Sequence, residues 1–411
     1  MAIGTGAPTK VPSAIEDRVV ALGPKLPAMP ERLLLAHARG QVLFIAGAGV
    51  SKAAELPDFR ALVVDVYQTL DPAVHAVIKD IPWSASNQWK TDLSTLTNQQ
   101  AAEVRRFILR DYDVVLGMLE RRIDDRASTA SRMRKTIADR LRKVSSKPAP
   151  IHRALMRLAD RGGASTIVTT NFEFLLEDAV PKRVRPAVQS YALGGIPRPG
   201  KSIEFAGVLH IHGALDRNST RASDLIVSDH DFGEFYLRRR IVPDFIYDAA
   251  RLYHLVLIGY SANDPPMRYL LNAVAADGKR FDDVKERFTL IGGGSTPDPI
   301  ELEDWRGRGI TPIHYNSAGG HIALLHALER WADLSTINGK PRLVDQEIRR
   351  ITRTTRNGAT TSDRDLFDHL IRRADSSERT RLMGVASKHG ADLSWLDAAI
   401  RVNQEGGLVG K

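Results

Sequence analysis

The chain has no cysteine among its 411 residues. Disulfide bonds, cysteine nucleophiles and cysteine-ligated zinc or iron–sulfur sites are therefore excluded. A chain without disulfides also fits a reducing compartment, and we expect a cytoplasmic protein. No run approaches the ~20 apolar residues that a membrane span needs, so no membrane partner is expected. The first residues, MAIGTGAPTKVPS, contain no apolar core, and we expect no secretory signal there.

The chain has an excess of basic charge, with a formal net charge of +9. Such an excess favours an anionic partner, and a salt-dependent contact with DNA that ignores sequence is one expectation. We find no base-reading motif, and no carboxylate cluster with the spacing of a nuclease metal site. The basic run RMRKTIADRLRKVSSK, from Arg132 to Lys147, has helical spacing. We interpret it as a solvated helix face.

The pattern of apolar runs predicts an α/β fold with a Rossmann-like parallel sheet. Each run ends in Gly, Ser, Asn or His and is followed by a helical pattern. Sheets of this kind bind ligands at the carboxyl ends of their strands. The predicted strands are Val42–Ala46, Thr166–Thr170, Val208–His212 and the runs within LYHLVLIGYS, RFTLIGGGS and GITPIHYN.

Three kinds of segment accompany the predicted sheet. Residues 1–26 are rich in Gly, Pro and Thr, and we expect a flexible N-terminal arm. The α/β domain is expected at residues 27–334, with a mainly helical insertion at about 61–147. Residues 335–411 are polar with helical spacing, which predicts a C-terminal helical region. The insertion and the C-terminal region are candidates for contacts in an assembly.

The stretch VLFIAGAGVSKAAELPDFR, from Val42 to Arg60, carries the first functional signal. Gly47 and Gly49 have no Cβ, so the backbone there can approach a ligand closely. We expect a helix to begin near Ser51, a good N-cap, and to offer free N–H groups to a pyrophosphate. A dinucleotide fingerprint needs a third glycine, and Ala53 stands close to that place. Alone, the two glycines are as typical of a tight structural turn.

The same stretch resembles the first motif of the sirtuin family, Gly-Ala-Gly-x-Ser followed by Pro-Asp-Phe-Arg. Three further motifs resemble the family in the same order along the chain. TTNFE has Asn171 at the position of the catalytic asparagine, and HIHG has His212 at that of the catalytic histidine. GYSANDPPM resembles the Gly-x-Ser strand end of the family. The matching residues include Gly47, Ala48, Gly49, Ser51, Pro57, Asp58, Phe59, Arg60, Thr170, Glu173, Gly213, Gly259, Ser261 and Asp264.

The departures from the sirtuin pattern are informative. Sirtuin deacylases carry four cysteines on a zinc ribbon, and this chain has none, so we expect neither a zinc ribbon nor protein deacylation. Thr170 replaces the family's glutamine, and Glu173 its aspartate. In these respects the chain resembles the sirtuin-like enzymes of bacterial antiphage defence, which degrade NAD. It is most similar to the subunit that pairs with a HerA-type ATPase. The resemblance implies NAD as the substrate, a homo-oligomer and an ATPase partner.

The chemistry of the motif residues suits cleavage of the bond between nicotinamide and ribose. The Asn171 amide can hold ribose hydroxyls and a water together. His212 can act as the general base, because imidazole titrates near working pH. Asp58 and Arg60 would brace the ribose and the phosphates, with Ser51 and Ser261 at the phosphates and adenosine. The remaining matched residues, Ala48, Phe59, Thr170, Glu173, Gly259 and Asp264, would line the NAD site.

Other interpretations stay open from the sequence. An asparagine at a strand end is commonly a turn former, and a strand histidine is commonly buried in the core. His210 and His212 share a strand face by spacing, but no third metal ligand accompanies them, and we expect no metal. The pocket could also sense NAD or ADP-ribose without cleaving it, within a structural subunit of an ATPase complex. A DNA-binding or nuclease component is the other alternative.

Overall fold

The computed structural model describes residues 18–86, 88–125, 130–143, 147–162, 164–180, 188–200, 205–216, 224–260, 265–278 and 283–408. Ser261 and Asp264, two of the predicted nucleotide-contacting residues, lie outside the described residues. By its contacts the chain divides into two compact units. Unit 1 comprises residues 1–42, 291–298 and 313–411, and unit 2 comprises residues 43–290 and 299–312.

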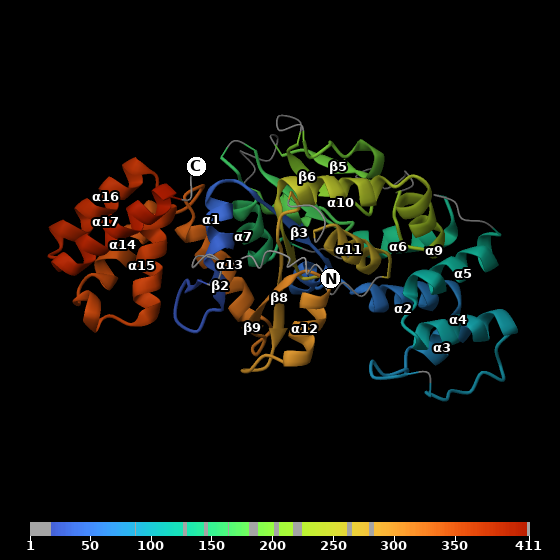
Figure 1. Cartoon of the computed structure of the whole chain (residues 1–411). Helices are drawn as coiled ribbons and strands as arrows, with labels where there is room; N and C mark the ends of the chain where they lie inside the picture. Colours follow the sequence, from blue (N-terminus) through green and yellow to red (C-terminus); the bar gives the residue numbers. More distant parts are fainter. Residues whose placement is uncertain are drawn as a thin grey trace, which may run out of the picture. The chain divides into compact units, whose positions relative to one another are not determined.

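A parallel sheet of seven strands confirms the predicted α/β fold class (Figure 1). The strand order is β5-β6-β4-β3-β7-β8-β9. The strands are β3 (Val42–Ala46), β4 (Thr166–Thr169), β5 (Ser190–Ala192), β6 (Gly207–His210), β7 (His254–Ile258), β8 (Arg287–Gly293) and β9 (Thr311–Asn316).

The strand order has a reversal between β3 and β7. The chain first builds outward from β3 through β4 and β6, and later builds outward in the other direction through β7, β8 and β9. Apart from the edge strand β5, this is the doubly wound Rossmann order, with three strands on each side of the reversal. In such sheets, ligands bind outside the carboxyl ends of the strands at the reversal, so the topology points to the end of β3.

The register of the sheet aligns the strand ends that carry the motifs. Every residue of β3 and β4 is buried, as expected for a parallel strand covered on both faces. Ala46 pairs with Thr169, and Thr169 pairs with His210. The strands β3, β4 and β6 therefore end level with one another. The segments that follow them emerge at one edge of the sheet.

The segment after β3 differs from its predicted form. A 3₁₀ helix, η1 (Ala48–Ala54), follows the glycines, and Ser51 lies inside it rather than at its start. The first α-helix, α2 (Phe59–Leu70), begins later and is capped by Asp58, whose side chain accepts from the Ala61 N–H. The prediction of a helix N-cap at Ser51 was therefore wrong, because the Asp58 carboxylate supplies the cap.

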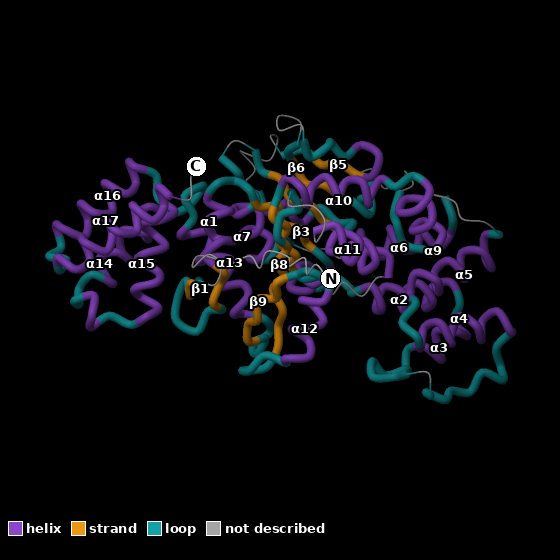
Figure 2. The backbone as a smooth tube through the Cα atoms, in the orientation of Figure 1, coloured by secondary structure: helices purple, strands orange, loops and turns teal. Residues whose placement is uncertain are grey.

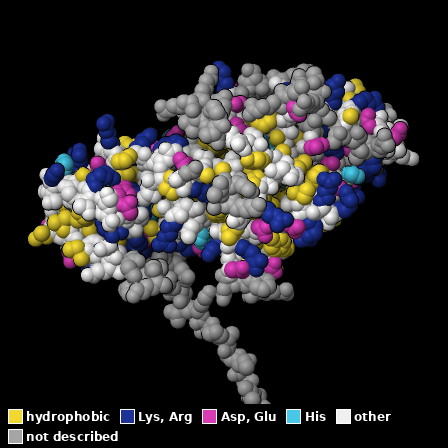
Figure 3. Space-filling view, turned by 90° about the horizontal axis from the view of Figure 1, so that it is seen from above, with side chains coloured by type: hydrophobic (Ala, Val, Ile, Leu, Met, Phe, Trp, Pro, Cys, Tyr) yellow, Lys and Arg dark blue, Asp and Glu magenta, His cyan; other side chains and the backbone are white. Residues whose placement is uncertain are grey.

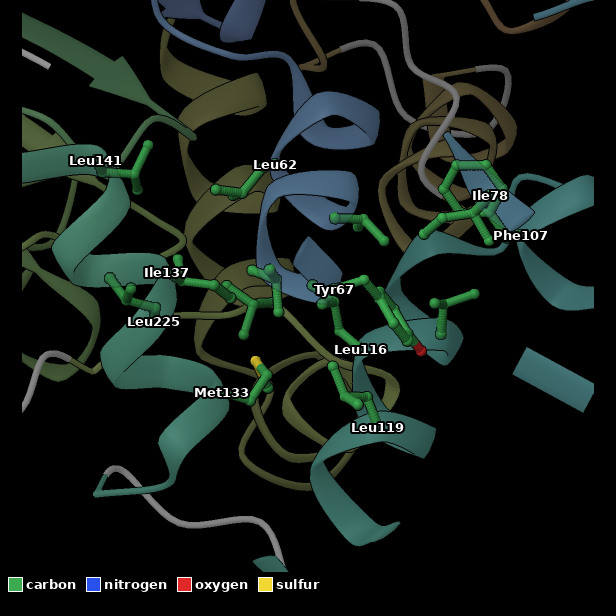
Figure 4. Close-up of a cluster of buried hydrophobic side chains, with 14 of the residues drawn as sticks. Leu62, Tyr67, Ile78, Phe107, Leu116, Leu119, Met133, Ile137, Leu141 and Leu225 are labelled. Atoms are coloured by element: carbon green, nitrogen blue, oxygen red, sulfur yellow. The ribbon is translucent and has the colours of Figure 1, made fainter. Parts of the chain in front are cut away.

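The helices of the predicted insertion surround a hydrophobic core that also includes residues from outside the insertion, such as Leu175 and Leu225 (Figure 4). Figure 1 shows α3, α4 and α5 lying together in unit 2. Tyr67, Phe107, Leu116 and Met133 are fully buried there, or nearly so. After α2, the helices are α3 (Pro72–Ile78), α4 (Asn98–Ile108), α5 (Tyr112–Asp124) and α6 (Arg132–Lys143).

The basic helix α6 is only in part the solvated face that its sequence suggested. Arg132 is largely exposed, but Arg134 is 5% exposed and bonds to two carboxylates, Glu120 and Asp231. A hydrophobic stripe that includes Met133 and Ile137 faces the insertion core. The interpretation of the whole run as solvated was therefore wrong at Arg134, where two buried acids neutralise the guanidinium.

Unit 2 is completed by further helices of 4 to 14 residues and by two helical turns. They are α7 (Pro150–Leu158), α8 (Leu175–Ala179), the 3₁₀ turn η3 (Leu193–Gly195), α9 (Asp229–Phe232), α10 (Ile241–Leu252), α11 (Pro265–Gly278) and α12 (Pro299–Gly307). A π-helical turn, η4 (Gly233–Arg238), joins α9 to α10. Turns of this type occur frequently at functional sites.

Unit 1 combines an N-terminal hairpin with the C-terminal helices. Strands β1 (Val19–Ala21) and β2 (Ala28–Pro30) pair antiparallel, so part of the predicted flexible arm forms a strand. On α1 (Glu31–Ala38), the buried Glu31 bonds to His369 and Arg372 of α15. The other helices are α13 (Ile322–Leu334), α14 (Pro341–Ile351), the 3₁₀ turn η5 (Arg356–Gly358), α15 (Thr361–Arg373), α16 (Ser376–Lys388) and α17 (Leu393–Leu408). Figure 2 shows no strand among the last four of them, α14 to α17. Within the described ranges, no helix has the length and apolarity to cross a bilayer.

Candidate functional site

Asn171 and Ser51 meet at the carboxyl ends of β3 and β4. The Asn171 Nδ2 amide donates to Ser51 Oγ at 2.9 Å and to the Gly47 carbonyl at 3.3 Å. The Asn171 main-chain N–H donates to Thr169 Oγ1 at 3.0 Å. Among the described residues, no hydrogen bond occupies Asn171 Oδ1. The side chain is thus held by its amide nitrogen, and its oxygen is left to accept from a ligand.

The Ser51 hydroxyl is the centre of a buried polar cluster. It donates to Glu173 Oε1 at 2.5 Å while it accepts from Asn171. Its third neighbour is His152, whose Nε2 lies 3.4 Å away. The Ala149 N–H donates to His152 Nδ1, so the neutral ring carries its proton on Nε2 and donates to Ser51. Burial lowers the pKa of His152 to about 4. A protonated Nε2 cannot deprotonate Ser51, so the cluster is no serine–histidine nucleophile.

The glycines at the end of β3 serve a close approach to the end of β7. The Gly49 N–H donates to the Gly259 carbonyl at 2.8 Å. Gly259 has φ +63°, and a Cβ built on it would lie 2.5 Å from the Val50 nitrogen. A Cβ on Gly47 would lie 2.7 Å from the Gly259 oxygen. Two backbones therefore meet at the reversal of strand order, and the glycines after β3 serve this contact between strand ends. The approach of a ligand to them stays a prediction.

His212 lies two residues beyond β6, in a turn that requires the glycine after it. Gly213 has φ +91°, and a Cβ there would lie 1.9 Å from the Asp224 carbonyl oxygen. His212 Nε2 is 2.6 Å from the phenolic oxygen of Tyr236, and the Phe232 ring packs edge-on against the imidazole. His212 is 7% exposed, and burial lowers its pKa to about 4. The prediction that His212 titrates near working pH was therefore wrong, because burial disfavours the charged ring. The ring is neutral at neutral pH, as a general base must be, but it is a weaker base than an exposed imidazole.

His210 and His212 do not face a common partner, although their spacing suggested one strand face. His210 is the last residue of β6 and is fully buried, with its two nitrogens bonded to the Asn171 carbonyl and to Glu177. His212 follows the strand end, where the alternation of strand side chains no longer holds. Within the described residues, no group of three or more His, Cys, Asp or Glu residues has the arrangement of a metal site.

The Pro-Asp-Phe-Arg residues contact the helical insertion. Asp58 caps α2, and the Phe59 ring packs edge-on against Tyr112 at 6.2 Å between ring centroids. Arg60 donates to the Ile81 carbonyl, and its guanidinium lies 5.2 Å from the centre of the Phe107 ring. These three residues are held by contacts of their own, whereas Gly47, Ser51, Asn171 and Glu173 share one network. Thr170 donates its main-chain N–H to Ala46, and Ala48 is exposed at the start of η1.

The motifs do not indicate four residues of the site. These are His152, Tyr236 and the pair of Glu177 and His210. A histidine on the apolar face of α7, among Ile151, Leu155 and Leu158, was the one available signal for His152. Tyr236 and Glu177 carry no signal of this kind, because only the folded chain brings them to His212 and His210.

Comparison with known proteins finds a family model that matches part of the chain. Residues 165–313 match the model of the SIR2-like domain, a stretch that includes Asn171, His212 and Gly259 but not the glycines after β3. The chain thus contains a region similar to that domain on a parallel α/β sheet. It is also 31% identical over 376 residues to the uncharacterized protein y4cA of Sinorhizobium fredii (strain NBRC 101917 / NGR234). That match covers 85% of this chain and 28% of the much longer relative.

Solved structures of Sir2 proteins are weakly similar to the chain. One describes the mechanism and regulation of Sir2 enzymes, at 14% identity and a TM-score of 0.32, covering 73% of this chain and 95% of the other. Another is a complex of a Sir2 homolog with NAD, at 14% identity and a TM-score of 0.33, covering 74% and 95%.

Proposed function

We propose that this protein hydrolyses NAD at the bond between nicotinamide and ribose, releasing nicotinamide and ADP-ribose. The observation that carries the proposal is the Asn171 amide, fixed by Ser51 and Gly47 at the reversal of strand order. The match to the SIR2-like domain over residues 165–313 supports it.

The reaction needs few groups. Nicotinamide leaves as a neutral molecule when the glycosidic bond breaks, and positive charge develops on the ribose, as in glycoside hydrolysis. Asn171 Oδ1 would accept from a ribose hydroxyl or from the attacking water. His212 would take the proton that water loses as its oxygen bonds to the ribose carbon. No metal enters this scheme.

The hydrogen bond between His212 and Tyr236 suggests how NAD cleavage could be kept inactive. An enzyme that destroys a central cofactor must stay inactive until it is triggered, and the hydroxyl of Tyr236 occupies Nε2 of the proposed base. We infer a role in antiphage defence by NAD depletion, from the resemblance of the motifs to that group. A homo-oligomer and a HerA-type ATPase partner belong to the same proposal. Purified alone, the protein is expected to turn over NAD slowly.

A sensor of NAD or ADP-ribose is the second candidate, and one observation favours it. His212 is almost completely buried, so the same pocket could hold a nucleotide without supplying a base to it. A role in binding DNA has less support. On the face shown in Figure 3, Lys and Arg side chains of the described residues are interspersed with Asp and Glu rather than gathered in one stripe.

The test is NAD consumption by the purified protein, alone and with the ATPase partner. Wild type would be compared with Asn171→Ala and His212→Ala, and with Asn316→Ala and His389→Ala as exposed controls of the same residue types. Stoichiometric nicotinamide, lost in the first two variants and kept in the controls, is the expected result. NAD that binds but survives in every condition would favour the sensor. Rapid turnover by a dilute monomer would contradict the proposed control by assembly.

A further inference from the structure

His210 and Glu177 form a buried pair, and His210 also bonds to the main-chain oxygen of Asn171. His210 is 0% exposed at the end of β6, and Glu177 is 1% exposed on α8. His210 Nε2 lies 2.9 Å from Glu177 Oε1, and that oxygen also accepts from the Ser190 hydroxyl. Glu177 Oε2 is buried and has no hydrogen-bond partner among the described residues. A carboxylate in such a place is costly to bury unless a charged partner compensates it.

The bonds of His210 define its protonation. Its Nδ1 lies 2.8 Å from the Asn171 main-chain oxygen, which can only accept, so Nδ1 carries a proton. Its Nε2 faces a carboxylate, which also accepts. Burial opposes a charge on the ring, but the bond to Glu177 and the negative charge of Glu177 outweigh it and raise the pKa of His210. The pair is thus an imidazolium beside a carboxylate.

The Asn171 peptide links this pair to the polar cluster of Ser51 by hydrogen bonds. Its carbonyl accepts from His210, while its N–H donates to Thr169 Oγ1. The side-chain amide is fixed separately by Ser51 and Gly47. A charged donor on a carbonyl makes a stronger bond than a neutral one. Both ends of Asn171 are therefore anchored, which sets the direction in which Oδ1 points.

We propose that the buried His210–Glu177 pair fixes the Asn171 peptide, and that His210 is a positioning residue for NAD cleavage. His210 touches neither substrate nor water in this role and acts only through Asn171. The proposal rests on the proposed function, because it assigns the pair a part in that reaction. It adds two residues to a site for which the motifs had supplied Asn171 and His212.

Two matched double variants separate positioning from simple support of the fold. His210→Asn with Glu177→Gln places an amide nitrogen where Nδ1 was, so the Asn171 carbonyl keeps a donor. His210→Gln with Glu177→Gln places the amide nitrogen where Nε2 was, and the Asn171 carbonyl loses its donor. Both remove the charged pair. The expected result is similar melting temperatures and similar KM for NAD, with kcat about 10²-fold lower in the second than in the first, since small displacements of a reacting group cost about that much.

Equal kcat values in the two double variants, with an active wild type, would overturn the positioning role. If the wild type cleaved no NAD under any condition, the proposed function itself would be wrong, and with it the role of His210 in that reaction. The pair itself has a separate readout. Nitrogen NMR of the wild type at pH 7.5 is expected to show one histidine with both ring nitrogens protonated, and to lose it in His210→Asn. A single neutral tautomer at His210 would contradict the imidazolium.

Discussion

The phenolic oxygen of Tyr236 lies 2.6 Å from Nε2 of His212. Tyr236 lies on the π-helical turn Gly233–Arg238. Arg240, two residues after that turn, has φ +55°. The turn thus presents the hydroxyl to Nε2 of the proposed base. His212 is therefore capped in this structure, and the cap comes from a segment with two local irregularities of the backbone.

We predict that Tyr236→Phe raises the basal rate of NAD cleavage. The hydroxyl must leave Nε2 before His212 can accept a proton, and a typical hydrogen bond contributes about 0.5–1.5 kcal/mol net. Its loss corresponds to a gain of roughly 2- to 10-fold in kcat. Tyr315→Phe, which removes the hydroxyl bonded to His321 in unit 1, is the matched control and should leave kcat unchanged. A lower kcat in Tyr236→Phe would show that the hydroxyl assists the reaction.

We predict that Gly259→Ala lowers the free energy of unfolding by more than the strain of placing alanine at a positive φ, because it also disturbs the junction of β3 and β7. Gly320 has a similar φ, +73°, but nothing within 4 Å of its Cβ position, so Gly320→Ala measures backbone strain alone, about 1–2 kcal/mol. At Gly259 the new methyl group also meets the Val50 nitrogen. Urea unfolding should show a larger loss of stability for Gly259→Ala, and NAD titration a weaker affinity. Equal losses of unfolding free energy in Gly259→Ala and Gly320→Ala would mean that the backbone at the junction shifts to accept the methyl group at little cost.

The buried Arg134 is predicted to stabilise the protein far more than its neighbour Arg132. Arg134→Ala leaves Glu120 and Asp231 buried without their partner, a change that costs about 3–5 kcal/mol. Arg132→Ala breaks an exposed pair with Asp124 and should cost at most about 1 kcal/mol. Urea unfolding of the two variants on one helix measures the difference. A loss below 1 kcal/mol at Arg134 would contradict the buried network.

We predict that the free energy of unfolding decreases on acidification, because the unfolded chain protonates His152 at a higher pH than the folded chain does. Burial lowers its pKa to about 4 in the folded chain, against an ordinary value of 6.5, so the unfolded chain binds more protons between these values. The free energy of unfolding then rises with pH across that window, and its loss on acidification approaches roughly 3 kcal/mol per histidine. His152→Gln should flatten the dependence between pH 6.5 and 4. The same slope in the variant would assign the effect to other groups.

The sequence alone indicated the fold class and the places of the main motifs. The apolar strand Val42–Ala46 and the β-branched strand Thr166–Thr169 can be recognised in the sequence, because a parallel strand is buried on both faces. Since parallel strands end at a common edge, the residues after them could be expected to lie near one another. Asn171, Ser51 and Glu173 do so. Their roles in the proposed reaction remain predictions.

Tertiary structure decided the partners, because contacts over long sequence separations leave no local pattern. Tyr236 on His212, Glu177 on His210 and His152 on Ser51 are examples. It also decided what the glycines after β3 approach, since Gly259 lies far along the chain and reaches them only through the order of the sheet. Apolar periodicity and turn chemistry act within a few residues and fix strands and helices. Burial and the pairing of charges act between elements, and they set the protonation of each histidine in the site.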